Sequence, residues 1–131
     1  MKIAEVSEKY GISTDTLRYY ERVGLIPTVN RNESGIREYR ENDLTWVSFI
    51  KCMRSAGLPI EALIEYVGLV QQGDPTIAAR KDILNEQRDL LVTRMQEMQK
   101  TLDILNHKIS VYEDIILKKE KKMISKESAD E

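Results

Sequence analysis

The sequence predicts a mostly α-helical chain, in which a head of short helices with one small β-hairpin precedes a single long helix. Three observations predict this class. Apolar residues recur at helical spacing through most of the 131 residues. Glycine and proline interrupt that spacing at a few points, which marks turns. Charged residues make up 32% and aromatic residues only 6%, a balance that favours helices over a large globular core.

Composition also limits the compartment and the class of function. No apolar run approaches the about 18 residues that span a bilayer, and no secretory signal is present, so we expect a cytoplasmic protein without membrane partners. The single cysteine, Cys52, cannot form an intramolecular disulfide and suggests a reducing compartment. One histidine, one cysteine and no glycine-rich phosphate loop leave too little for a catalytic site, so an enzyme is the least expected class.

The first two helices, within residues 3–22, are separated by a tight turn. Gly11 ends the first helix because glycine accepts the left-handed conformation, Ser13 can cap the second, and Gly24 stops it before a proline. Leu17 and Leu25 are expected to face inward. The other face carries short polar side chains, arginines and a phenol, which suit a DNA major groove and its flanking phosphates: Thr14, Arg18, Tyr19 and Arg22. This pattern predicts a helix-turn-helix.

The helical period is lost between residues 30 and 40. A turn centred on Asn32–Gly35 with short flanks predicts a small β-hairpin, with Arg37 and Tyr39 on one face by the two-residue period. Such a hairpin is marginal alone and must pack on a helical core. Next to a helix-turn-helix it would be a wing. A helix pair over residues 42–73 then completes a predicted head of residues 1–73.

Residues 74–118 are expected to form a coiled-coil helix. Two apolar series with a seven-residue period run along it, interrupted early by Lys81 and Arg88. From Thr76 to Leu117 the helix would span roughly 60 Å. A domain of this size cannot cover so long a stripe, so we expect a homodimer; a helix folded back on its own head would suit half this length. The predicted dimer seam comprises Leu84, Leu91, Met95, Met98, Leu102, Leu105, Ile109, Tyr112 and Ile116. Residues 119–131 are expected to be a disordered tail.

Net charge does not decide the partner of the head. Seven Lys or Arg stand against six Asp or Glu between residues 13 and 54. A DNA-binding face must therefore come from the placement of arginines. The alternative is an interaction protein, in which the head docks onto another protein and the coiled coil scaffolds an assembly. Convergence of Arg18, Arg37 and Arg40 on one face would favour DNA.

The order of helix-turn-helix, arginine-bearing wing, helix pair and long seam resembles the MerR family of bacterial transcription regulators. The resemblance lies in residues 16–27, 31–40, 43–44 and 57–61, and extends to about Ile116. Ile36 departs from the family, which usually has an aromatic residue there. The resemblance implies a dimeric winged-helix regulator, held by an antiparallel coiled coil. Such a dimer binds double-stranded promoter DNA and activates by distorting the spacer, so that RNA polymerase can engage.

The resemblance also implies roles for individual residues. The candidates for groove contacts are Thr14, Thr16 and Arg18. The candidates for phosphate contacts are Tyr19, Tyr20, Arg37, Tyr39 and Arg40, with Arg54 as a second backbone contact near the turn of the helix pair.

The absence of certain residues limits which chemical signal such a regulator could sense. Metal-sensing members carry cysteines at both ends of the long helix, whereas this chain has Ala78 and Ala79 at its start and no cysteine after position 52, so we expect no metal and no cofactor. Cys52 resembles the thiol-based branch of AdhR/NmlR-type regulators, which respond to aldehydes or nitrosative stress. Lys51 and Arg54 would favour the thiolate, but neither is spaced to lie beside the sulfur. A buried, inert thiol in a regulator without thiol sensing is the alternative.

Overall fold

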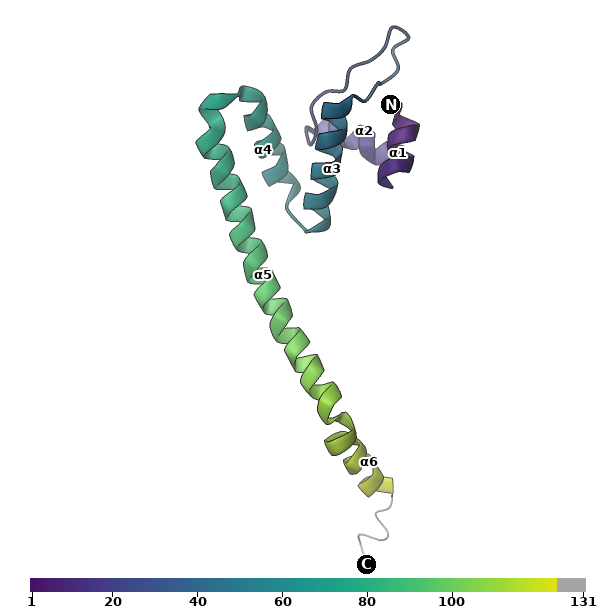
Figure 1. Cartoon of the computed structure of the whole chain (residues 1–131), viewed down its shortest axis with the longest axis vertical. Helices are drawn as coiled ribbons and strands as arrows, with labels where there is room; N and C mark the ends of the chain where they lie inside the picture. The colour runs from purple at the N-terminus through teal and green to yellow at the C-terminus, as the bar shows by residue number, and fades with distance from the viewer. Residues whose placement is uncertain (125–131) are drawn as a thin grey trace, which may run out of the picture. The chain divides into compact units, whose positions relative to one another are not determined.

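The computed structural model describes residues 1–124, and it divides into two compact units, Met1–Arg88 and Asp89–Glu131. The chain is mostly helical, as the sequence predicts (Figure 1). The first unit contains α1 (Ile3–Tyr10), α2 (Thr14–Val23), α3 (Glu41–Ser55), α4 (Ile60–Gln72), the 3₁₀ turn η1 (Asp74–Thr76) and the beginning of α5 (Ile77–Val111). No helix among residues 1–124 has the length and apolar character needed to cross a membrane.

The turn between α1 and α2 is set by the residues that the sequence predicts. Gly11 follows α1 with φ 65° and Gly24 follows α2 with φ 87°, both in the left-handed region. The Ser13 hydroxyl oxygen accepts a hydrogen bond from the Thr16 backbone N–H at 3.1 Å and so caps α2. Leu17 and Leu25 are fully buried, which confirms that they are structural.

The predicted β-hairpin over residues 30–40 is wrong, because this segment is a loop with no strand within the described chain. One isolated antiparallel bridge joins Arg31 and Arg37. The Asn32 side-chain oxygen accepts from the N–H groups of Ser34 at 2.9 Å and Ile36 at 3.0 Å. These bonds hold the tip as a side-chain-stabilised turn. The Asn32 N–H donates to the Ile36 carbonyl and the Glu38 N–H to the Asn30 carbonyl, both at 2.8 Å, but the pairing extends no further than this one bridge. We call residues 28–40 the wing loop.

The core of the first unit lies between the helix-turn-helix and the pair formed by α3 and α4. Val47 and Ile50 of α3 are fully buried, and Leu63 and Val67 of α4 nearly so. An aromatic cluster at the margin of this core also joins the pair. Its ring centroids lie 5.6–6.4 Å apart, in tilted and edge-on arrangements, and its members are Trp46, Phe49 and Tyr66. Both the core and the aromatic cluster therefore hold α3, the helix that carries Cys52, against α4.

The junction from α4 to α5 is tied by side-chain bonds to the end of α4. The Thr76 hydroxyl donates to the Leu69 carbonyl at 2.6 Å, and Arg80 donates to the Gly73 carbonyl at 3.2 Å. Gln87, three turns into α5, is buried. These contacts place the start of the long helix in the first unit, so the division at residues 88 and 89 lies beyond the predicted head boundary at 73 and 74.

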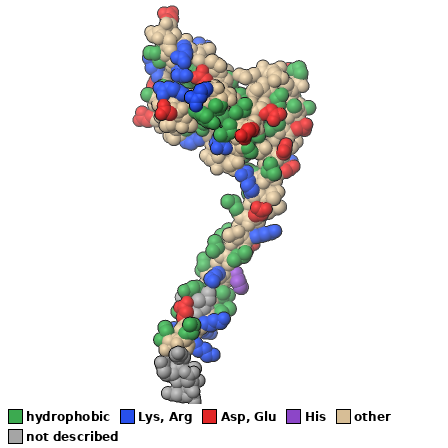
Figure 2. Space-filling view, turned by 180° about the vertical axis from the view of Figure 1, so that it is seen from behind, with side chains coloured by type: hydrophobic (Ala, Val, Ile, Leu, Met, Phe, Trp, Pro, Cys, Tyr) green, Lys and Arg blue, Asp and Glu red, His purple; other side chains and the backbone are tan. Residues whose placement is uncertain are grey.

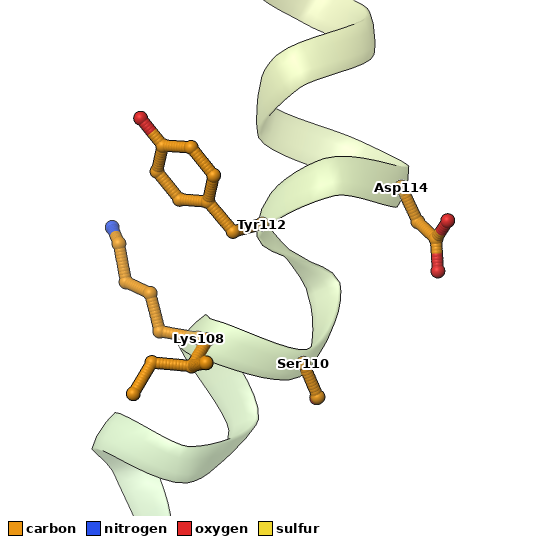
Figure 3. Close-up of a pocket in the computed structure, with 5 residues that line it drawn as sticks. Lys108, Ser110, Tyr112 and Asp114 are labelled. Carbon is orange, nitrogen blue, oxygen red and sulfur yellow. The ribbon is translucent and has the colours of Figure 1, made fainter.

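In the second unit, α5 reaches Val111 and is followed by a π-helical segment, η2 (Tyr112–Ile116), and by α6 (Leu117–Ile124). Figure 3 shows this segment, where Lys108 and Tyr112 project from one side of the helix and Asp114 from the other. Residues 119–124, predicted to belong to a disordered tail, are helical; the rest of that prediction lies outside the described residues.

Candidate nucleic-acid interface

The amino-terminal half of α2 presents the three residues expected to enter a groove. Arg18 is exposed, and its Nη1 lies 3.1 Å from the Asp15 carboxylate and 3.5 Å from the Thr14 hydroxyl. The Thr16 hydroxyl accepts from the Ser13 hydroxyl at 2.8 Å, within the helix cap. Arg18 is therefore an exposed donor that is held at the start of α2 by Asp15 and Thr14.

Arg37 of the wing loop forms an ion pair with Glu21 of α2. Arg37 Nε donates to Glu21 Oε1 at 2.7 Å, and Glu21 Oε2 accepts from the Val29 backbone N–H at 3.1 Å. The two charged side chains are only 22% and 11% exposed, respectively. Sequence reasoning missed Glu21, because no local pattern distinguishes it from an ordinary solvated glutamate. One carboxylate thus ties both ends of the wing loop to α2.

Tyr39 is among the predicted phosphate contacts, but the structure buries its side chain. Its side chain is 2% exposed and belongs to the hydrophobic core, and its hydroxyl has no hydrogen-bond partner among the described residues. A phenol in this position cannot contact a DNA backbone without leaving the core. Alternation along a hairpin would have placed it beside Arg37 on one face, but the segment is not a hairpin.

The bond between Arg37 and Glu21 brings the wing-loop arginine to the part of α2 that carries Arg18, because Arg18 and Glu21 are one helical turn apart. Burial raises the pKa of Tyr39 most, the Glu21 and Asp43 carboxylates raise it further, and the Arg37 and Arg18 guanidinium groups lower it. Arg18 of α2 and Arg37 of the wing loop therefore act on the same phenol. Figure 2 shows Lys and Arg side chains gathered on part of the first unit. Such placement can create a basic face without a basic composition.

The remaining predicted phosphate contacts are partly engaged within the chain. The Arg22 guanidinium lies 5.5 Å from the centre of the half-buried Tyr19 ring. Burial raises the pKa of Tyr20, and the positive charge of Arg54 lowers it. Arg54 Nη1 also donates to the Leu58 carbonyl at 2.7 Å, across the turn from α3 to α4. Exposed Arg40 lies at the start of α3.

Cys52 is exposed in this chain, which contradicts the alternative of a buried thiol. The neighbouring cations are directed elsewhere, as helical spacing predicts. Lys51 Nζ donates to the Tyr10 carbonyl at the end of α1, and Arg54 bonds Leu58. Residues 1–124 contain no group of three or more His, Cys, Asp or Glu side chains that could hold a metal ion.

A capped helix-turn-helix with an arginine from α2 and an arginine from the wing loop in one neighbourhood defines a DNA-binding protein. The family model for MerR HTH family regulatory proteins matches residues 1–68, and the model described as MerR, DNA binding matches residues 44–108. The chain belongs to the MerR family of transcriptional regulators, which are not enzymes.

Three relatives extend this result. The chain is 59% identical to the HTH-type transcriptional regulator AdhR of Bacillus subtilis (strain 168) over 92 residues, which cover 70% of the chain and 66% of that relative. A crystal structure of a MerR family protein from Listeria monocytogenes matches with a TM-score of 0.88 and 44% identity over 100% of the chain and 99% of its own. HiNmlR, a MerR family regulator lacking the sensor domain, was crystallised bound to promoter DNA. It matches with a TM-score of 0.78 and 32% identity over 86% of the chain and 90% of its own.

Proposed function

We propose that this regulator binds promoter DNA as a homodimer in the cytoplasm and activates transcription by distorting the spacer DNA, so that RNA polymerase engages indirectly through the promoter. The observation that carries the proposal is the bond from Arg37 of the wing loop to Glu21, which lies one helical turn from Arg18 on α2, so the two arginines belong to two elements that a DNA duplex can contact together. The promoter-bound relative HiNmlR, with its similar fold, supports it. Specificity and switching would then depend on deformation energy as well as on base contacts.

The candidate contacts divide by the kind of DNA group they would meet. Thr14, Thr16 and Arg18 are proposed for the major groove, since they lie at the start of α2. Backbone phosphates would be met by donors flanking that helix: Tyr19, Tyr20, Arg37, Arg40 and Arg54. Tyr39 is not among them, because it is buried.

The apolar stripe of residues 74–118 supports dimerisation. Many apolar side chains of the seam are exposed in this chain; Met98, for example, is 71% exposed and Ile109 is 70% exposed. A continuous apolar surface of this kind marks an interaction site. A second copy would bury them as a coiled coil. The exposed seam members are Leu84, Met95, Met98, Leu102, Leu105, Ile109 and Tyr112. Leu91 is half-buried, and the side chain of Ile116 lies outside the described residues.

Reactive aldehydes or nitrosative stress are the proposed signal, with Cys52 as the sensor thiol. Its exposure and the likeness to AdhR support this proposal. An adduct on α3 would repack a helix that Lys51 ties to the helix-turn-helix. The expected result is that Cys52→Ser binds operator DNA normally but does not induce a reporter when formaldehyde, methylglyoxal or a nitric oxide donor is added. Normal induction would favour the alternative, a regulator without thiol sensing.

DNA binding itself is tested with the sequences that the protein selects. DNA co-purified with the chain from cells is sequenced to define the operator, and a gel shift compares that operator with random DNA. We expect Arg18→Ala to lose discrimination and Lys100→Ala, which removes an exposed charge from α5, to bind as wild type does. Equal binding of operator and random DNA by the wild type would favour the interaction protein.

A further inference from the structure

Glu21 of α2 is bonded to two points of the wing loop, which the other carboxylate of α2, Asp15, is not. Each of its oxygens accepts a different hydrogen bond: Oε1 from Arg37 Nε at 2.7 Å, and Oε2 from the Val29 N–H at 3.1 Å. The side chain is 11% exposed. An ionised acceptor makes charge-assisted bonds that are stronger than neutral ones, and partial burial reduces screening by water and salt.

Asp15, on the same helix, provides a direct contrast. It also pairs with an arginine, Arg18, at 3.1 Å, but its side chain is 94% exposed. Exposed pairs of this kind contribute little, because solvent screens them and both side chains stay mobile. Glu21 is therefore expected to restrain Arg37 more strongly than Asp15 restrains Arg18.

We propose that Glu21 is a positioning residue for DNA binding, which orients the Arg37 guanidinium toward a backbone phosphate. This inference rests on the proposed function. The guanidinium is a planar fork with five N–H donors, and the bond to Glu21 uses the one on Nε. With Nε fixed, the plane of the fork is fixed, and the donors on Nη1 and Nη2 stay available for a phosphate. A side chain that is already ordered loses less conformational entropy on binding.

Two other roles for Glu21 make different predictions. If Glu21 only anchors the loop through Val29, its effect on DNA binding is independent of Arg37. If it instead neutralises Arg37 and competes with the phosphate, removing its charge strengthens binding. Positioning requires that the loss caused by changing Glu21 disappears once Arg37 is absent, because two residues that act as a unit are not additive.

The test is a double-mutant cycle on operator affinity, measured by fluorescence anisotropy at one fixed salt concentration with full-length protein. Glu21→Gln keeps a side-chain oxygen for Val29 but loses the charge. We expect it to weaken operator binding about tenfold in the wild-type background. In the Arg37→Ala background the same change should alter affinity by less than about twofold. Asp15→Asn is the matched control, and it should stay within about twofold of wild type.

Each outcome bears on a distinct statement. Tighter binding by Glu21→Gln, or equal losses in both backgrounds, overturns the positioning role. A wild-type protein that does not distinguish operator from random DNA contradicts the proposed function, and the inference falls with it. Thermal melts establish that the variants are folded. If Glu21→Gln does not fold, Arg37→Lys keeps the positive charge without the fork, and wild-type affinity in that variant overturns the inference.

Discussion

At the scale of single residues, the burial of Tyr39 and the ion pair of Glu21 with Arg37 change which wing-loop side chains are candidates for DNA contacts. Tyr39 contributes its ring to the core and leaves a hydroxyl without a partner in the described chain. Arg37 is half of a partly buried ion pair. Of Arg37 and Tyr39, only Arg37 therefore remains a proposed DNA contact.

We expect Tyr39→Phe to retain both the fold and DNA affinity. The change removes a buried hydroxyl that has no partner, so the free energy of unfolding should stay level or rise by up to about 1 kcal/mol. Urea denaturation and operator titration measure the two quantities. A folded variant with tenfold weaker DNA binding would restore Tyr39 as a phosphate contact.

The raised pKa of Tyr39 also predicts an alkaline loss of stability. Burial favours the neutral phenol, so the folded-state pKa lies above the value of 10.0 for an exposed tyrosine. The folded state then holds its proton where the unfolded state has lost it, so this contribution is complete below about pH 10 and falls as the pH rises further. Urea midpoints measured between pH 9 and 11 should fall less steeply in Tyr39→Phe. Parallel curves would contradict the assignment.

At the scale of elements, the helices are held by local signals that are legible in the sequence. Gly11, Ser13 and Gly24 act where spacing predicts, because caps and left-handed turns depend on one or two residues. The wing loop was not predictable in the same way. Asn32 closes its own turn, and Glu21 meets Arg37 across sixteen positions, a contact that only tertiary packing creates. Local patterns thus predict the helices and select the arginines that are proposed to contact DNA, but they do not predict the Glu21 carboxylate that holds Arg37.

Loss of the cap on α2 should be measurable. Ser13→Ala removes the acceptor for the Thr16 N–H, and we expect it to lower the free energy of unfolding by about 1 kcal/mol. Ser48→Ala, in the middle of α3, is the control, because alanine has the higher helix propensity there. Chemical denaturation of the two variants should diverge. Equal stability would show that the cap contributes nothing.

At the scale of the whole molecule, the long helix requires a partner. The exposed seam of α5 is apolar over several heptads, and a buried, unpaired carboxylate within it would cost several kcal/mol. Light scattering on Leu102→Asp should therefore show monomer or unfolded chain. Lys100→Asp, two residues away and outside the seam, should remain dimeric. An intact Leu102→Asp dimer would rule out the coiled-coil interface.

Salt titration of DNA binding by wild type, Arg18→Ala and Arg37→Ala tests most directly whether α2 and the wing loop form the DNA interface. Arg18 is expected to contact bases, so Arg18→Ala should reduce the ratio of operator to random-DNA affinity. Arg37 is expected to contact a phosphate, so Arg37→Ala should weaken binding to both and lower the slope of log affinity against log salt by about one. Wild-type affinity and slope for both variants on both DNAs would contradict this interface.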